Sequence, residues 1–206
     1  QQRVALVRAM APRPDILLLD EPFSSMDAEL REQIAREVRD LLKRDGITAI
    51  LVTHDQREAM MLADKIVVMN DGKIVETGNP INLYEEPQNL FTGYFIGSPG
   101  MNFLACTLDG NTARIDGARI ELDEDTAALG NKAQGKLELG IRPMYLEIHA
   151  QSISGGIPAS VRTVEDQGSF KIVTVSLAGH TLRARLPEGR TVPHKEAWLR
   201  FPTRWT

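Results

Sequence analysis

The sequence predicts an α/β domain over residues 1–97, followed by a small all-β domain over residues 98–206. In the first part, apolar residues at helical spacing alternate with short, wholly apolar runs, which are typical of buried parallel strands. In the second part, apolar and polar residues alternate with a period of two, as in strands with one buried face. The period changes after Ser98-Pro99-Gly100, which places the expected boundary near residue 97.

The first domain opens on a helical pattern at residues 4–10. The apolar run at 16–19 predicts a strand that is covered on both faces. Asp27 is the expected N-cap of the next helix, and Gly46 supplies the signal that ends it.

Two further apolar runs predict strands at residues 49–52 and 66–69, and a further strand is expected at residues 73–77, after the turn that follows the second run. Asp55 and Glu58 have the spacing of a capping box at the start of a helix. Asp71-Gly72 is expected to form a hairpin turn, and Asn79-Pro80 to open a short helix.

The second domain is predicted to consist of short strands in a barrel or compact sandwich. Its clearest alternating runs lie at residues 137–141, 173–177, 182–186 and 197–201. Gly168-Ser169 and Ala178-Gly179 lie between runs and predict turns. Arg183 and Arg185 share one strand face, which we interpret as solvated.

Composition excludes several classes of protein. The net charge of −4 argues against a broad nucleic-acid surface, which normally needs a basic face. No run of apolar residues is long enough to cross a bilayer as a helix. The single cysteine, Cys106, excludes an internal disulfide and is compatible with a reducing cytosol.

Two carboxylates end the first predicted strand. Asp20 and Glu21 follow the apolar run directly, and parallel strands deliver such residues to the sheet edge where α/β folds bind ligands. In nucleotide hydrolases one acid helps to hold Mg²⁺ and a second polarises the attacking water. The alternative is a solvated pair that only ends a strand.

The surrounding loops favour the catalytic interpretation. Ser24-Ser25-Met26-Asp27 follows the acids, and Thr53-His54-Asp55 closes the next strand. Because both strands end at the same sheet edge, His54 is expected one strand away from the acid pair. An imidazole there can bond to a terminal phosphate, although a single histidine is more often a surface residue.

These segments resemble motifs of the ABC ATPases in their order and spacing. Residues 16–21 resemble the second nucleotide motif, residues 24–27 the dimer-contacting D-loop, and residues 53–55 the switch-histidine loop. Residues 1–6 resemble the stretch after the Leu-Ser-Gly-Gly-Gln signature.

The resemblance narrows to the ATP-binding subunits of sugar importers of the maltose and glycerol-phosphate type. Residues 56–60, 63–72 and 95–103 resemble that subgroup, and Gly-Ile-Arg-Pro at 140–143 resembles the signature of its β-rich regulatory domain. The implied fold is a partial P-loop ABC ATPase domain followed by an OB-like, TOBE-type domain, which we expect to be incomplete at its end. Turn chemistry alone explains the Gly and Pro of residues 140–143, so a strand end and turn is favoured there over direct ligand binding.

The resemblance implies a role for each candidate site residue. Asp20 would hold Mg²⁺ through water, Glu21 would polarise the attacking water, and His54 would sense the γ-phosphate of ATP. Ser25 and Asp27 would contact the nucleotide site across a homodimer. The implied partners are integral-membrane permease subunits and, indirectly, a solute-binding receptor, with the protein peripheral on the cytoplasmic face of the membrane and no nucleic acid bound.

Two motifs of the family do not occur in the sequence. Neither a Gly-x-x-x-x-Gly-Lys-Ser/Thr loop nor a Leu-Ser-Gly-Gly-Gln segment is present. The first would supply the backbone N–H groups and the lysine that cradle the phosphates. We therefore expect the chain to be a front-truncated portion of its parent and to be inactive as an ATPase alone.

Two other functions remain open at this point. One is a non-enzymatic regulatory or dimerisation module, in which the β domain is the working part. The other is an ABC ATPase that acts on nucleic acid, against which the acidic charge balance argues.

Overall fold

A computed structural model describes residues 2–133 and 135–205. The chain forms two compact units, Gln1–Thr92 and Gly93–Thr206, so the division falls a few residues before the change of period near residue 97. Gln1, which opens the stretch that resembles the segment after the family signature, lies outside the described residues.

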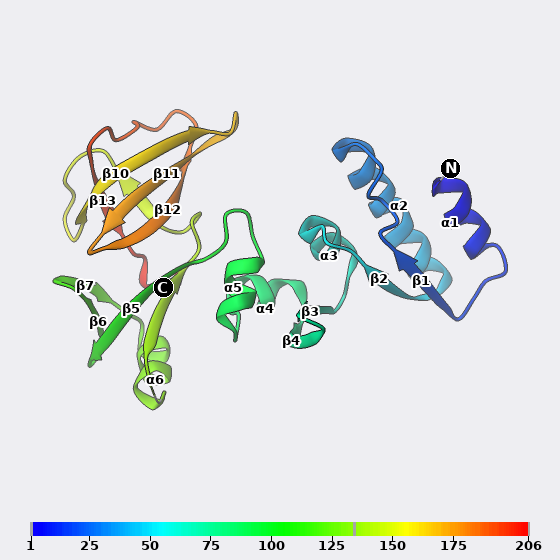
Figure 1. Ribbon diagram of the computed structural model, residues 1–206, viewed down its shortest axis with the longest axis horizontal. Coiled ribbons are helices and arrows are strands. Elements are labelled where there is room, and N and C mark those ends of the chain that lie inside the picture. The colour runs from blue at the N-terminus through cyan, green and yellow to red at the C-terminus, as the bar shows by residue number, and fades with distance from the viewer. Residues whose placement is uncertain (1, 134, 206) are drawn as a thin grey trace. The chain divides into compact units, whose positions relative to one another are not determined.

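The first unit alternates helices and strands (Figure 1). Its elements are α1 (Gln2–Met10), β1 (Ile16–Asp20), α2 (Ala28–Asp45), β2 (Thr48–Val52), α3 (Gln56–Leu62), β3 (Ile66–Asn70), β4 (Lys73–Gly78) and α4 (Pro80–Glu85), and α5 (Leu90–Phe95) spans the boundary. β1 and β2 pair in parallel, whereas β3 and β4 form an antiparallel hairpin.

Local signals in the sequence account for these boundaries. The Asp27 carboxylate accepts a hydrogen bond from the Leu30 N–H at 3.0 Å and begins α2. Gly46 ends α2 in the left-handed region with φ 67°, and Asn79 caps α4. Asp71 and Gly72, both at positive φ, make the turn between β3 and β4. These predictions are confirmed.

The core of the first unit lies along one side of α2. Phe23, Ile34, Ala35 and Val38 are buried there, with residues of α3 packed against them. The prediction that the strand at residues 16–19 is covered on both faces is wrong for the described chain.

One face of the β1–β2 pair is open. The exposed fractions are 58% for Ile16, 71% for Leu18, 54% for Ile50 and 57% for Val52, whereas Leu17 is buried. Successive side chains of a strand point to opposite faces, and no described element packs on the second face of this two-stranded sheet.

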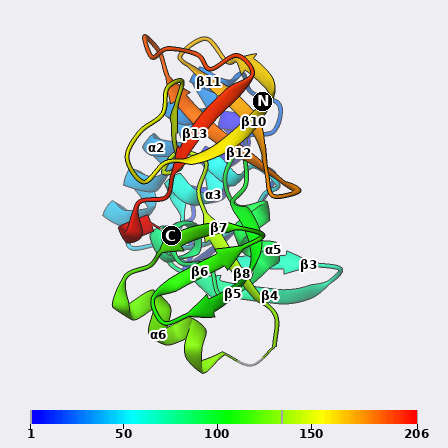
Figure 2. The same ribbon diagram turned by 90° about the vertical axis from the view of Figure 1, so that its left-hand side faces the viewer.

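The second unit is rich in β-structure (Figure 2). Its elements are β5 (Asn102–Asp109), β6 (Thr112–Ile115), β7 (Ala118–Glu121), α6 (Glu124–Lys132), β8 (Leu137–Ile141), β9 (Glu147–His149), β10 (Ile157–Asp166), β11 (Phe170–Leu177), β12 (His180–Pro187), β13 (Glu196–Arg200) and the 3₁₀ turn η1 (Thr203–Trp205). The strands form a five-stranded sheet, β12-β11-β10-β13-β9, and a four-stranded sheet, β7-β6-β5-β8.

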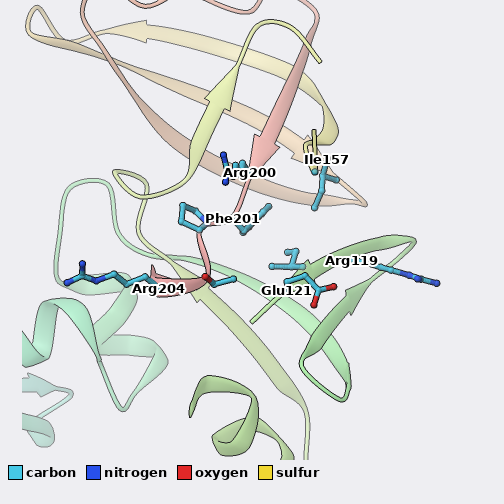
Figure 3. A pocket seen from close by; sticks show the side chains of 10 residues that line it. Arg119, Glu121, Ile157, Arg200, Phe201 and Arg204 are labelled. Carbon is cyan, nitrogen blue, oxygen red and sulfur yellow. The ribbon is translucent and has the colours of Figure 1, made fainter. Parts of the chain in front are cut away.

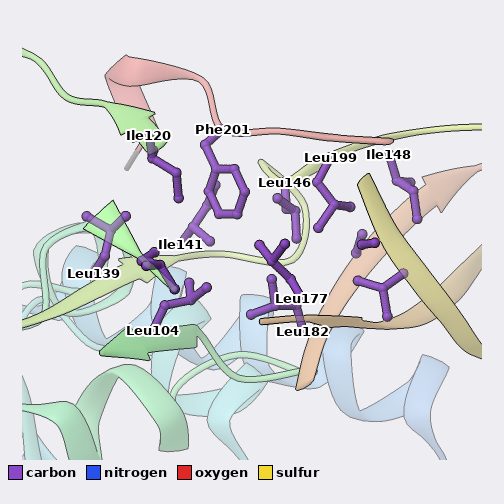
Figure 4. Close-up of a cluster of buried hydrophobic side chains, with 14 of the residues drawn as sticks. Leu104, Ile120, Leu139, Ile141, Leu146, Ile148, Leu177, Leu182, Leu199 and Phe201 are labelled. Atoms are coloured by element: carbon purple, nitrogen blue, oxygen red, sulfur yellow. The ribbon is translucent and has the colours of Figure 1, made fainter. Parts of the chain in front are cut away.

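A single core joins the two sheets of this unit. Leu104, Leu139 and Ile141 come from the four-stranded sheet, and Leu182 and Leu199 from the five-stranded sheet (Figure 4). The predicted fold class, an α/β part followed by a β-rich part, is confirmed. The helix α6, which Asp123 caps, is an addition to the predicted all-β domain.

The β12 edge of the large sheet is sealed by polar groups. The buried Asn102 side chain donates to the Arg183 carbonyl at 2.9 Å and accepts from the Arg183 N–H at 2.8 Å. The Arg185 N–H donates to the Pro143 carbonyl at 2.7 Å. Three backbone groups of this edge strand are thus paired within the unit instead of being left open.

Arg142 is almost completely buried and links β8 to the first residues of this unit. Its exposed fraction is 1%, and its guanidinium donates to the carbonyls of Gly93, at 2.8 Å, and Ile96. The Gly-Ile-Arg-Pro segment therefore ends β8 and also holds the start of this unit in place.

Asn102 offers a test of the sealed edge. Asn102→Ala leaves the Arg183 N–H and C=O unpaired, and we expect the free energy of unfolding of the β unit to fall by about 2–4 kcal/mol. Urea denaturation followed by tryptophan fluorescence measures it, because both tryptophans of the chain, Trp198 and Trp205, lie in this unit. Asn111→Ala, at an exposed position, is the control. A loss no larger than that of the control would contradict the role of Asn102.

Candidate functional site at the carboxyl edge of β1 and β2

The parallel pairing of β1 and β2 brings the predicted site residues to one edge. Asp20, the last residue of β1, is in register with Val52, the last residue of β2. The loops that follow these two strands carry Glu21 and His54. The carboxyl end of a parallel sheet is where α/β folds place their ligands.

Glu21 has an unusual backbone conformation. Its φ is 47°, in the left-handed region that a residue with a side chain rarely adopts. Its N–H donates to the Val52 carbonyl at 2.9 Å, and its own carbonyl accepts from Ser24 Oγ at 3.0 Å. Such conformations cost of the order of 1–3 kcal/mol and cluster at functional sites. The chain therefore turns sharply at Glu21, next to the end of β2.

Glu21 and His54 form a close acid–base pair. Glu21 Oε1 lies 2.6 Å from His54 Nδ1. The hydrogen bond to Glu21, and next the Glu21 charge, raise the pKa of His54 above its ordinary value. Both groups face solvent, with exposed side-chain fractions of 36% for Glu21 and 79% for His54. The pair is accessible to a ligand and, being solvated, contributes little to stability.

In the described part of the chain, the other three predicted residues, Asp20, Ser25 and Asp27, do not bond to the Glu21–His54 pair. Asp20 is exposed, and within residues 2–133 and 135–205 its carboxylate forms no hydrogen bond or ion pair. Asp27 uses its carboxylate as the cap of α2, and Ser25 is exposed. In that same part of the chain, no hydrogen bond or ion pair joins Ser25 or Asp27 to the Glu21–His54 pair.

Asp20 fits a magnesium ion that is held mainly by water and substrate. Mg²⁺ in phosphoryl-transfer sites keeps several waters and takes one or two carboxylates. The described residues include no group of three or more His, Cys, Asp or Glu side chains arranged to hold a metal ion. A single accessible carboxylate suits a site in which water and substrate supply most of the ligands, and does not suit a site made of protein ligands alone.

The capping-box prediction at Asp55 and Glu58 is half right. Asp55 caps α3 and accepts from the Arg57 N–H at 2.8 Å. Glu58 does not return to the Asp55 N–H, which donates to Thr53 Oγ1 at 3.0 Å. Glu58 instead accepts from Thr53 Oγ1 at 2.7 Å and pairs with Arg31, a residue that belongs to none of the predicted motifs.

The β unit contains a hollow of about 550 Å³ (Figure 3). It is lined by Arg119, Ile120, Glu121, Gly155, Ile157, Arg200, Phe201, Pro202, Thr203 and Arg204. Arg119 and Arg204 extend in opposite directions, away from Phe201 between them. Their guanidinium groups therefore do not converge on one ligand position, and the sheet edge in the first unit is the better candidate site.

Known proteins match both units of the chain. Residues 97–143 match the family described as the MalK OB fold domain. Over 98% of its length the chain is 39% identical to an sn-glycerol-3-phosphate import ATP-binding protein of Agrobacterium fabrum, and over 95% it is 38% identical to a sulfoquinovosyl glycerol transport ATP-binding protein of the same organism. The chain is a homologue of the C-terminal portion of ABC-importer ATP-binding proteins.

This homology covers nearly all of the chain but only part of its relatives. The chain spans about half the length of the curated proteins it matches, 54% and 55% for the two Agrobacterium proteins. A spermidine/putrescine import ATP-binding protein of Pseudomonas aeruginosa is 40% identical over 92% of the chain, with 52% of that protein covered. The chain is therefore about equally identical to ABC-importer subunits that are named for quite different solutes.

Among solved structures, the molybdate-binding protein ModG matches 50% of the chain and 89% of its own length, at 13% identity and a TM-score of 0.34. Within the described part of the chain, no helix is long and apolar enough to cross a membrane. The OB-like character of the β unit rests on the family match.

Glu21→Gln is expected to lower the pKa of His54 toward 6.5, the ordinary value for histidine, because the variant removes the carboxylate that stabilises the imidazolium. A raised folded-state pKa stabilises the fold below the ordinary pKa, and this contribution is lost as pH rises through the raised value. An NMR titration of the imidazole measures the shift. The exposed Glu29→Gln on α2 is the control, and an unchanged His54 pKa in Glu21→Gln would refute the contact.

Proposed function

We propose that this chain is the C-terminal portion of the ATP-hydrolysing, energy-coupling subunit of a bacterial ABC importer for a sugar or related solute. The observation that carries the proposal is the Glu21–His54 pair, 2.6 Å apart beside the exposed Asp20, in a homologue of ABC-importer ATP-binding proteins. Residues 1–97 would form the C-terminal part of the nucleotide-binding domain, and residues 98–206 a regulatory domain.

In this proposal each residue at the sheet edge has a distinct task. Asp20, at the end of a Walker B strand, would hold Mg²⁺ through water, and the ion would supply positive charge that neutralises the phosphates of ATP. Glu21 polarises the attacking water. His54 donates a hydrogen bond to the terminal phosphate, for which its raised pKa is suited because protonation is favoured.

The proposed assembly is a homodimer that encloses ATP between its copies. Ser25 and Asp27 lie on the exposed loop after β1, where a second copy can reach them. The dimer would act on integral-membrane permease subunits from the cytoplasmic face, and a solute-binding receptor would engage the permease. The net charge of −4 supports a partner set without nucleic acid.

The proposal of a sugar or related solute is supported by the family match more than by sequence identity. Relatives named for glycerol phosphate and for polyamines are almost equally similar to the chain. The match of residues 97–143 to the MalK OB fold domain supports the sugar-importer subgroup.

The function is tested by ATP turnover in the complete importer subunit. We expect Glu21→Gln to lower kcat about 10²–10⁴-fold, as expected when a positioned proton-accepting group is removed, while ATP binding persists. A phosphate-release assay measures turnover, and Glu29→Gln serves as the control.

The 206-residue chain alone is expected to show no turnover, because its sequence has no phosphate-cradling loop. Turnover by this chain that vanished in Glu21→Gln would contradict that expectation. A complete subunit that binds no ATP but dimerises through its β domain would instead support a regulatory module.

A further inference from the structure

Arg31 links the two loops that carry the candidate catalytic pair. It lies in the first turn of α2, and its Nη2 donates to the Met26 carbonyl at 2.9 Å, on the loop after β1. Its Nη1 donates to Asp55 Oδ2 at 2.6 Å, on the loop after β2. One guanidinium thus contacts the loop of Glu21 and the loop of His54.

Through Glu58, Arg31 is also linked to Thr53, the residue before His54. Arg31 Nε lies 3.6 Å from Glu58 Oε1, and the other oxygen of Glu58 accepts from Thr53 Oγ1 at 2.7 Å. Thr53 Oγ1 in turn accepts from the Asp55 N–H at 3.0 Å. The neighbours of His54 on both sides are therefore held by one network.

Burial decides which interactions fix the position of His54. The exposed side-chain fractions are 3% for Glu58, 23% for Asp55 and 25% for Arg31, compared with 79% for His54. Hydrogen-bonded ion pairs that are shielded from water are stronger and less screened than exposed pairs. The solvated Glu21–His54 contact is too weak to hold the two loops in place. The buried network therefore determines the distance between Glu21 and His54.

We propose that Arg31 is a positioning residue, which fixes the spacing between the Glu21 loop and the His54 loop through Met26, Asp55 and Glu58. Its consequence for catalysis rests on the proposed function, whereas its effect on the Glu21–His54 contact does not. Only arginine supplies the planar fork that these partners require at once, since lysine offers a single nitrogen.

The His54 titration separates positioning from simple electrostatics. The groups that act on His54 are Glu21, Asp55 and Glu58. Removing the positive charge of Arg31 from beside these acids would by itself raise the pKa of His54. Losing the Glu21 contact would instead lower it toward 6.5. We expect the second outcome for Arg31→Met, measured by NMR on the 206-residue chain.

Arg36→Met is the matched control, because Arg36 lies on the same helix and pairs at the surface with Glu32. Its His54 pKa should equal that of the unmodified chain. A His54 pKa in Arg31→Met that is unchanged or raised, with the amide signals of α2 intact, overturns the proposal. If Arg31→Met loses those signals, Arg31→Lys decides by the same criterion, with a smaller fall expected.

A second readout uses the complete subunit. Arg31→Met should lower kcat about 10–100-fold with KM nearly unchanged, because misplacement of the reacting groups affects the transition state more than ATP binding. An unmodified subunit without turnover would refute the proposed function but leave the His54 titration valid. Normal kcat in Arg31→Met, together with a lowered His54 pKa, would show that the spacing does not matter for hydrolysis and would overturn the catalytic part of the inference.

Discussion

The parallel pairing of β1 with β2 is the constraint on which the candidate site depends. Pairing in the register Asp20 with Val52 makes both strands end at the same level, so the loops after them start side by side. The bond from the Glu21 N–H to the Val52 carbonyl extends this pairing by one residue into the loop. If β1 slipped by one residue against β2, every side chain of the shifted strand would point to the opposite face, and Glu21 would be separated from His54.

The two units differ in how far their strands are covered by other parts of the same unit. In the β unit, Asn102 and the Pro143 carbonyl pair with β12, and both sheets share one core. In the first unit, the described elements cover one face of a two-stranded sheet and leave Leu18 and Ile50 exposed. Apolar residues in such a continuous patch usually mark a surface that another segment or protein covers.

Much of the fold follows from local signals in the sequence. The caps Asp27, Gly46 and Asn79 and the Asp71-Gly72 turn are set by residues a few positions apart. The closeness of Glu21 and His54, 33 residues apart, was inferable because parallel strands share an edge. The Arg31 network was not, since no short motif encodes a guanidinium that bonds to two loops and lies 3.6 Å from a buried acid. Likewise, the apolar runs at β1 and β2 show what the strands can bury, not what covers them.

The left-handed backbone at Glu21 places two separate demands on one position. The carboxylate must reach His54, and the main chain must tolerate a φ of 47°. Asparagine accepts that backbone readily, whereas valine or isoleucine would be strained by their branched Cβ. Substitution by β-branched residues would therefore distort the turn as well as delete the acid, so the loss of a function in such a variant would not identify which of the two changes caused it. Glutamine keeps both the turn and the length of the side chain, so it is the replacement that reports on the carboxylate alone.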